Sequence, residues 1–263
     1  MCMRTRRIDV IQPGMRIDLP RLQNSIALVI DILRASTTIV TALANGCREI
    51  IPASEIKDAR QIFASRPQSS TLLCGERKGR KIEGFDMGNS PLEYSTERVS
   101  GRTLVLTTSN GTRALAKAGD AKKILVLSFL NFQAVCDLLC ERMDDVFIFC
   151  SGTDGLESLE DSVCAGMLCK KLQSTCKDRV MFNNAAKDAI VLAGKHQTDL
   201  RAMLRKSKHG SFLMNEGFAD DLDRCARLNT RSVIPVYKKG LIRKKYEKPL
   251  QAEIANGKTQ ILK

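Results

Sequence analysis

The sequence predicts an α/β fold, in which a largely parallel or mixed sheet is flanked by layers of helices. Short β-branched and aliphatic runs alternate with longer segments whose apolar residues recur at helical spacing, which is typical of βα units. No low-complexity linker divides the chain. We therefore expect a single α/β unit over residues 1–245, built as one domain or as two packed halves, followed by a polar, aperiodic tail over residues 246–263.

Apolar runs define the expected strands, and helical periodicity defines the helices between them. The strands are expected at residues 26–30, 49–52, 71–74, 103–106, 124–127, 146–149 and 233–236. The helices are expected at residues 37–44, 56–64, 112–118, 132–143, 159–173 and 212–228. Residues 183–208 also show helical periodicity, but we can assign them no partner strand.

Composition excludes several classes of protein. The longest apolar runs, such as residues 26–30, are far shorter than the roughly 20 residues of a membrane-spanning helix. The basic N-terminus is not followed by the apolar segment of a signal peptide, so we expect a cytoplasmic protein that does not enter a membrane. The ten cysteines contain no Cys-x-x-Cys pair and there are two histidines, which argues against zinc-ribbon, redox and histidine-rich metal sites. We expect reduced thiols.

The formal net charge of +13 fits a nucleic-acid surface, a field that attracts a small polyanion, or a solvated basic face, and the solvated face is the simplest of the three. The basic runs at residues 204–209 and 237–245 lack interleaved aromatic residues, and the chain has no Trp for base stacking. We therefore favour a small anion. A nucleic-acid or nucleotide-binding protein without catalysis is the alternative, and it predicts basic residues gathered away from the carboxylates. The hypothesis of an enzyme instead predicts that positive potential is focused on the carboxylates.

Polar residues follow five of the expected strands, at the edge where open α/β sheets bind ligands. Asp31, Arg34 and Ser36 follow the first strand, and Glu76 and Arg77 follow the third. Further polar residues follow the strands that end at residues 106, 127 and 149. Any one cluster also fits helix capping, but capping does not require arginines beside carboxylates. The five ends together predict one polar crevice.

The loop at residues 107–112 is the best candidate for binding phosphate. Its small residues and Gly111 precede an expected helix, so backbone N–H groups can point at an anion. Ser158 and Asp161 have the spacing of a capping box, which leaves Glu160 as the freer carboxylate. Cys74 and Arg80 match the Cys-x5-Arg pattern of thiolate phosphatases, but the same spacing recurs twice elsewhere, so we expect no thiolate mechanism.

Seven ordered segments resemble the 2-phosphosulfolactate phosphatases of the coenzyme M pathway. They span much of residues 4–240 and comprise residues 31–38, 75–77, 84–91, 106–112, 128–131, 158–166 and 207–210. The resemblance implies an α/β enzyme that hydrolyses 2-phospho-3-sulfolactate to 3-sulfolactate and phosphate with Mg²⁺. Cys74 stands where the family usually has a small residue, often glycine, and the segment after residue 245 is an addition, so the substrate is less firmly implied than the reaction.

These arguments give one set of expected site residues. Magnesium prefers hard oxygen ligands and needs only one or two carboxylates beside the substrate. We expect Asp31 and Glu76 to bind it, with Glu160 or Asp161 in reserve, and Asp31, Glu76 and Arg34 to be catalytic. Whether water or a side chain such as Asp31 attacks phosphorus stays open, as does the oligomeric state, with which a homo-oligomer is compatible. The expected substrate-binding residues are Arg77, Ser36, Thr108, Asn110, Gly111, Thr112, Arg113 and His209.

Overall fold

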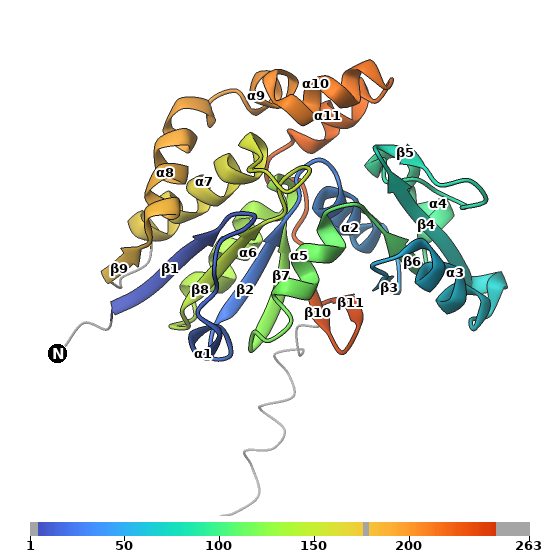
Figure 1. Cartoon of the computed structure of the whole chain (residues 1–263), viewed down its shortest axis with the longest axis horizontal. Helices are drawn as coiled ribbons and strands as arrows, with labels where there is room; N and C mark the ends of the chain where they lie inside the picture. Colours follow the sequence, from blue (N-terminus) through green and yellow to red (C-terminus); the bar gives the residue numbers. More distant parts are fainter. Residues whose placement is uncertain (1–4, 176–178, 246–263) are drawn as a thin grey trace, which may run out of the picture.

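A computed structural model describes residues 5–175 and 179–245 of the chain. These residues form an α/β fold in which one eleven-stranded sheet is flanked by helices (Figure 1). The predicted fold class is confirmed, and the sheet is mixed. No helix in the two described ranges combines the length and apolar character that a membrane span requires. The tail expected at residues 246–263 lies outside the described residues.

The elements are as follows. The strands are β1 Thr5–Ile11, β2 Ile26–Ile30, β3 Glu49–Pro52, β4 Thr71–Arg77, β5 Arg80–Lys81, β6 Thr103–Thr107, β7 Lys123–Leu127, β8 Val146–Cys150, β9 Arg179–Phe182, β10 Pro235–Lys238 and β11 Leu241–Lys244. The α-helices are α1 Leu19–Leu22, α2 Ala35–Ala44, α3 Ile56–Ala64, α4 Thr96–Val99, α5 Gly111–Lys117, α6 Phe132–Cys140, α7 Leu159–Thr175, α8 Asn184–His196, α9 Leu200–Lys206, α10 Lys208–Asn215 and α11 Ala219–Cys225.

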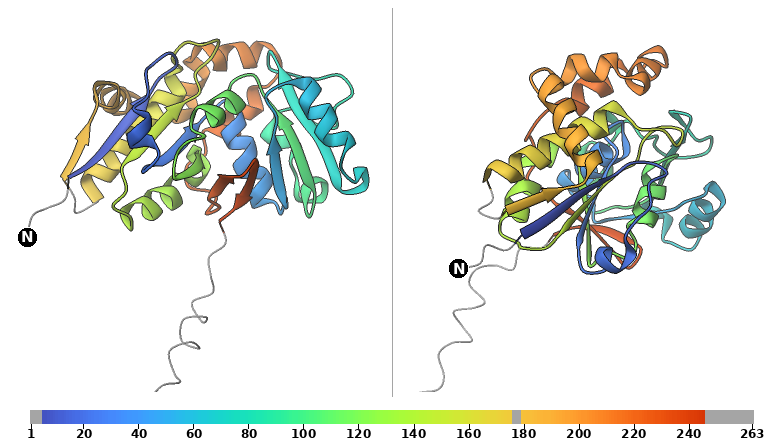
Figure 2. Two further views of the ribbon diagram at one scale, coloured as in Figure 1. Left: turned by 60° about the horizontal axis from the view of Figure 1, so that its bottom comes forward. Right: turned by 60° about the vertical axis from the view of Figure 1, so that its left-hand side comes forward.

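Two blocks of parallel strands make up most of the sheet, in the order β5-β4-β6-β3-β11-β10-β7-β2-β8-β1-β9. Strands β4, β6 and β3 form one block, and β7, β2, β8, β1 and β9 form the other. The hairpin β10–β11 joins them, because β10 pairs antiparallel with β7 and β11 pairs antiparallel with β3. In both views of Figure 2 the hairpin lies at the opposite end of the molecule from α10 and α11.

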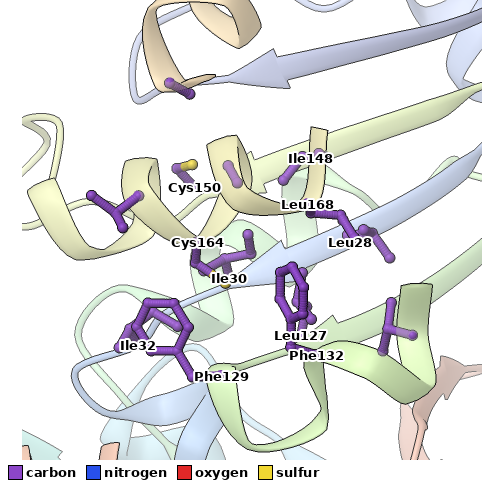
Figure 3. Packing of buried hydrophobic residues seen from close by; sticks show 14 of the residues in the cluster. Leu28, Ile30, Ile32, Leu127, Phe129, Phe132, Ile148, Cys150, Cys164 and Leu168 are labelled. Carbon is purple, nitrogen blue, oxygen red and sulfur yellow. The ribbon is translucent and has the colours of Figure 1, made fainter. Parts of the chain in front are cut away.

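Helices bury both faces of the larger block, which explains why its strands are apolar along their whole length. Ile26, Leu28 and Ile30 of β2 face one core layer, where α6 and α7 pack; Figure 3 shows Leu28 and Ile30 beside Cys164 and Leu168 of α7. Ala27 and Val29 face the opposite layer with residues of α2 and α5. Burial on both faces, rather than alternation, therefore produced the apolar runs that located this strand.

All seven predicted strands overlap observed ones, but four strands were missed. Strand β1 escaped notice because Arg6, at its second position, interrupts the apolar pattern; this side chain is 1% exposed and donates to the backbone carbonyls of Leu139 and Asp144. Strand β9 supplies the partner that residues 183–208 lacked. Strand β5 is two basic residues long, and β11 is four residues long with two apolar residues followed by two basic ones, so neither carries a clear strand pattern.

One helix prediction was wrong. A continuous helix was expected at residues 212–228, but the chain forms α10 and α11, which are separated near Gly217. Gly217 has a φ of 87°, a left-handed conformation that ends the first helix and redirects the chain. The predicted strand at residues 233–236 is likewise shifted, since β10 covers Pro235–Lys238.

Candidate active site

A cavity of about 340 Å³ lies at the carboxyl ends of β2, β4, β6 and β8. Its walls come from both parallel blocks and from α10. The predicted residues that line it are Asp31, Arg34, Glu76, Asn110 and His209. The end of β7 does not take part: Ser128 and Asn131 are fully buried and cap the turn that follows this strand. The prediction of a shared crevice thus fails for one of its five strand ends.

Asp31 follows β2 directly and lies at the centre of a group of carboxylates. Its Oδ1 accepts a hydrogen bond from the backbone N–H of Ala35 at 3.3 Å, and its side chain lines the cavity. Burial raises the pKa of Asp31 well above its ordinary value, and the negative charges of Asp161, Glu76 and Glu160 raise it further. In the protein alone, ionised Asp31 is therefore costly, and a cation at this point would stabilise its charge.

Glu76 is the last but one residue of β4, so this strand is longer than predicted and carries the carboxylate itself. The Oε1 atom accepts from the backbone N–H of Ser109 at 2.7 Å, and Oε2 accepts from the N–H of Gly79 at 2.8 Å. These hydrogen bonds fix the carboxylate between the turn after β4 and the loop after β6. Oε2 also accepts from the hydroxyl of Ser109 at 3.3 Å, so the lone pair that remains for a further ligand is on Oε1.

Gly111 begins α5 against Asp31. A Cβ at this position would lie 2.8 Å from Ala35 Cβ, 3.0 Å from Asp31 Oδ2 and 3.3 Å from Thr108 Oγ1. The hydroxyl of Thr108 is buried without a hydrogen-bond partner in the described structure. Glycine therefore leaves a space bounded by two oxygen atoms, one of them an orphaned hydroxyl.

Arg34 lines the cavity, but its guanidinium is held by the protein. It donates to Asp221 Oδ2 at 2.6 Å and to the backbone carbonyl of Gly79 at 2.5 Å, and it lies 4.2 Å from the ring centre of Phe218. Arg34 thus joins the turn after β4 to α11. This arrangement fixes the cavity wall and leaves only part of the charge of Arg34 for a substrate.

The two reserve carboxylates do not line the cavity. Asp161 accepts backbone N–H groups with both oxygens, from Ile32 at 2.9 Å and from Gly152 at 3.0 Å, so it clamps the turns after β2 and β8. Its backbone N–H donates to Ser158 Oγ at 3.3 Å, as the capping-box spacing predicted. Glu160 is 2% exposed, and burial and the charge of Asp161 raise its pKa to about 7.

The remaining predicted residues lie around the cavity rather than on its surface. Arg77 donates to Glu76 O, Ser54 O and Thr107 Oγ1. The hydroxyl of Ser36 bonds to the backbone of Asp31, and the hydroxyl of Thr112 donates to Thr108 O. Arg113 lines a separate cavity of about 120 Å³ on the far side of Asn110. These residues therefore support the walls of the cavity without lining it.

His209 enters the cavity from α10, where its ring stacks on Phe212 with centroids 5.8 Å apart. Burial and the neighbouring charge of Arg34 lower the pKa of His209 below its ordinary value. At neutral pH the imidazole is therefore uncharged. It can donate or accept one hydrogen bond, but it does not supply the positive charge that a simple anion ligand would need.

Sequence reasoning missed several lining residues. Lys78 lies in the tight turn after β4, Lys208 begins α10, and Asn89 carries a buried Oδ1 that has no partner in the described structure. Asn89 and Lys208 belong to segments that were noted as motifs, at residues 84–91 and 207–210, without a role for either residue. Lys78 follows Glu76 by two positions, and only the turn geometry reveals it.

The cysteine pattern carries no site. Cys74 is fully buried in β4, and burial raises its pKa, so it is a neutral thiol. Arg80 instead points to solvent and pairs with Glu216. A thiolate nucleophile with an arginine clamp is therefore absent at this position.

The donor atoms at the cavity fit a hard cation. No group of three or more His, Cys, Asp or Glu side chains is arranged to hold a metal within residues 5–175 and 179–245. Mg²⁺ does not need such a group, since it keeps several waters and binds through one or two carboxylates plus substrate oxygens. Asp31 and Glu76 supply two carboxylates, and Thr108 supplies an unpartnered oxygen nearby.

Fold and site together define a class: an α/β protein whose strand ends gather carboxylates and cations around one small-molecule cavity. Comparison with known sequences makes the class specific. The model of the 2-phosphosulpholactate phosphatase family matches residues 15–240, and the chain belongs to this family, whose members are phosphoric monoester hydrolases. The prediction of the family is confirmed.

Curated relatives agree along nearly their whole length. A probable 2-phosphosulfolactate phosphatase of Clostridium beijerinckii is 36% identical over 236 residues, 90% of this chain and 98% of that protein. One from Clostridium tetani is 39% identical and covers 90% of this chain and 99% of its own length. One from Symbiobacterium thermophilum is 41% identical over 84% of this chain and 94% of its own length.

Proposed function

We propose that this protein is a Mg²⁺-dependent phosphatase that hydrolyses 2-phospho-3-sulfolactate to 3-sulfolactate and phosphate, in the cytoplasm and as a step of coenzyme M biosynthesis. Family membership and the names of the relatives support the reaction and the substrate. The eight cysteines within the described residues are all free thiols, in keeping with a reducing compartment.

The charge balance of the cavity carries the proposal of a metal ion. Three carboxylates, Asp31, Glu76 and Asp154, line the cavity, and so do three cations, Arg34, Lys78 and Lys208. The expected concentration of positive charge around the carboxylates is therefore not found in the side chains. A phosphate ester that also bears a carboxylate and a sulfonate carries about four negative charges at neutral pH. A divalent cation at Asp31 and Glu76 would make the site attractive to such an anion.

Each lining group has a defined task in this proposal. Bound Mg²⁺ would neutralise charge on the phosphoryl oxygens. Asp31 and Glu76 hold the ion, Asn110 donates to the ester, and Lys78 and Lys208 bind the remaining anionic groups at the cavity mouth. Neutral His209 orients the substrate by a hydrogen bond. Whether water or Asp31 attacks phosphorus is a separate question, which solvent-oxygen labelling of the enzyme would answer.

Phosphate release from a panel of small phosphorylated acids, each with and without Mg²⁺, tests the proposed activity. We expect turnover of 2-phospho-3-sulfolactate only with the cation, and faster turnover than for 2-phospholactate, which lacks the sulfonate. The variant Lys208→Ala should raise KM for the sulfonated ester more than for 2-phospholactate. Lys187→Ala, which removes an exposed lysine of α8, is the matched control. Equal KM changes for both esters would contradict the role given to Lys208.

A further inference from the structure

A second cavity of about 440 Å³ lies between the amino ends of β2 and β7 and the hairpin β10–β11. Figure 1 shows this hairpin in the lower part of the view, away from α10. Helix α10 contributes Lys208, His209 and Phe212 to the lining of the active-site cavity. No residue lines both cavities. We refer to the second cavity as the basic groove. Its charged residues are Lys122, Lys123, Arg142, Asp144, Lys238, Lys244 and Lys245.

The charge of the basic groove is strongly one-sided. Six of these side chains are cationic and one is anionic, which leaves five net positive charges. Asp144 is already paired, with Lys122 at 2.6 Å and with Arg142 at 4.0 Å. The active-site cavity, in contrast, has a balanced lining. The large positive charge of the chain is thus concentrated in part at a site that the proposed reaction does not use.

Two groups in the groove are poorly accommodated by the protein alone. The Nε atom of Arg142 is buried and has no hydrogen-bond partner among the described residues. Lys123 is partly buried, and burial together with the charges of Arg142 and Lys245 lowers its pKa. An anion in the groove would offset the mutual repulsion of Lys123, Arg142 and Lys245. A merely solvated basic surface would not bury these groups.

We propose that the basic groove is a binding site for a compact polyphosphate, the triphosphate group of either inorganic triphosphate or a nucleoside triphosphate. The groove is a half-open concavity of about 440 Å³ rather than a stripe along the surface, so it suits a small ligand better than a nucleic acid. Its one aromatic side chain is Tyr237, and single-stranded nucleic acids are usually held by several stacking residues. Tyr237 can contact a base if the ligand is a nucleotide.

Isothermal titration of the full chain with inorganic triphosphate and with ATP, in metal-free buffer, tests the proposal. The double variant Lys123→Gln, Arg142→Gln should weaken the binding of both ligands roughly tenfold or more, since it removes two charge-assisted contacts. The double variant Lys57→Gln, Lys187→Gln removes the same charge from exposed sites outside the groove and should bind as the wild type does. Thermal melting establishes that each variant is folded.

Comparing the affinities for inorganic triphosphate and for ATP shows which of the two kinds of triphosphate the groove binds. Similar affinities indicate inorganic triphosphate or any triphosphate ester, whereas tighter binding of ATP that Tyr237→Ala abolishes indicates a nucleotide. Three results overturn the proposal: no binding by the wild type, equal affinity in the groove variant, or loss of binding in Lys208→Ala, which would place the ligand in the active-site cavity. Tighter binding of a short DNA duplex than of triphosphate overturns it in favour of a nucleic acid.

Discussion

The guanidinium of Arg34 and the carboxylate of Asp221 form an ion pair at 2.6 Å, although they lie 187 positions apart in sequence and each side chain is only 2% exposed. The second oxygen of Asp221 accepts from the hydroxyl of Ser90. One carboxylate therefore connects the turn after β2, the segment after β5 and helix α11. Asp221 does not line the cavity, yet it holds a residue that does.

Asp221→Ala should destabilise the protein by about 3–5 kcal/mol, because it leaves the buried charge of Arg34 without its partner. Asp221→Asn keeps an acceptor for Arg34 and should cost less. Chemical denaturation of both variants measures the difference, with Asp220→Asn, at an exposed neighbouring position, as the control. A loss of less than about 1 kcal/mol in Asp221→Ala would mean that water replaces the carboxylate.

The proposed metal ligands give the second prediction. Asp31→Asn and Glu76→Gln keep size and remove charge, so each should lower kcat/KM by roughly a hundredfold or more, equivalent to about 2.7 kcal/mol. Asp31→Asn should also raise the melting temperature of the metal-free protein, because it removes a charge from a buried group of carboxylates. If Asp31 only capped α2, Asn would serve equally well and turnover would be unchanged. Asp188→Asn, on the exposed side of α8, is the control.

The stability of the metal-free protein should fall as pH rises. Burial raises the pKa of Glu160 to about 7 and that of Asp161 to about 6, above the values of 4.5 and 3.8 ordinary for these side chains. The folded state therefore keeps protons that the unfolded chain has released, and the stabilisation present below about pH 4 is lost by about pH 7. Denaturation in a chelating buffer at several pH values measures the slope.

Two substitutions distinguish the contributions of Glu160 and Asp161 to the stability of the metal-free protein. At pH 8, Glu160→Gln should raise stability by on the order of 1–3 kcal/mol, since it removes a buried charge. Asp161→Asn should lower it, because an amide cannot accept the N–H groups of both Ile32 and Gly152. Stabilisation by both variants would show that the clamp between the turns is weak.

Gly111→Ala should reduce activity while the protein stays folded. The added methyl group would press on Asp31 Oδ2 and Ala35 Cβ, and would fill the space beside Thr108. Gly194→Ala, in α8, is the matched control: a Cβ there meets nothing within 4 Å, so it should stabilise the helix by about 0.5–1 kcal/mol without a change in rate. If Gly111→Ala and Gly194→Ala hydrolyse the substrate at the same rate, the space beside Asp31 and Thr108 has no role in the activity.

Cys74→Ser should keep most of the phosphatase activity. The thiol is neutral and buried, and Arg80 is turned away from it, so neither takes part in the proposed reaction. A thiolate mechanism would instead lose several orders of magnitude in kcat. Single-turnover rates of the variant and the wild type distinguish the two, with Cys225→Ser as a second buried-thiol control.

The sequence predicted those parts of the fold and site that are local. Asp31 and Asn110 were identified because each follows a strand whose two buried faces leave a continuous apolar run. Glu76 was identified with its strand end misplaced, since the polar residues that extend β4 do not look like a strand. Lys78 and Asp221 could not be found in this way. Their roles depend on a tight turn and on a contact across most of the chain.

The predictions that failed share a physical cause. Ser128 and Asn131 carry the residue types of a ligand site but satisfy their hydrogen bonds within a turn, and composition alone cannot distinguish the two uses. Arg77 was expected to hold the phosphoryl group and Arg113 the sulfonate or carboxylate, but neither side chain lines the active-site cavity. Which way a long side chain turns depends on neighbours such as Ser54 and Thr107, which the sequence does not place.

The position of the β10–β11 hairpin also has a consequence for synthesis of the chain. The strands that it connects, β3 and β7, are made more than a hundred residues earlier, and their bonding edges face the hairpin in the finished sheet. Until residues 235–244 leave the ribosome, both edges are open templates for pairing with other chains. Between the synthesis of β7 and that of the hairpin, the nascent protein therefore holds its sheet in two unjoined blocks, and its exposure to aggregation at these edges ends only when β10 and β11 insert.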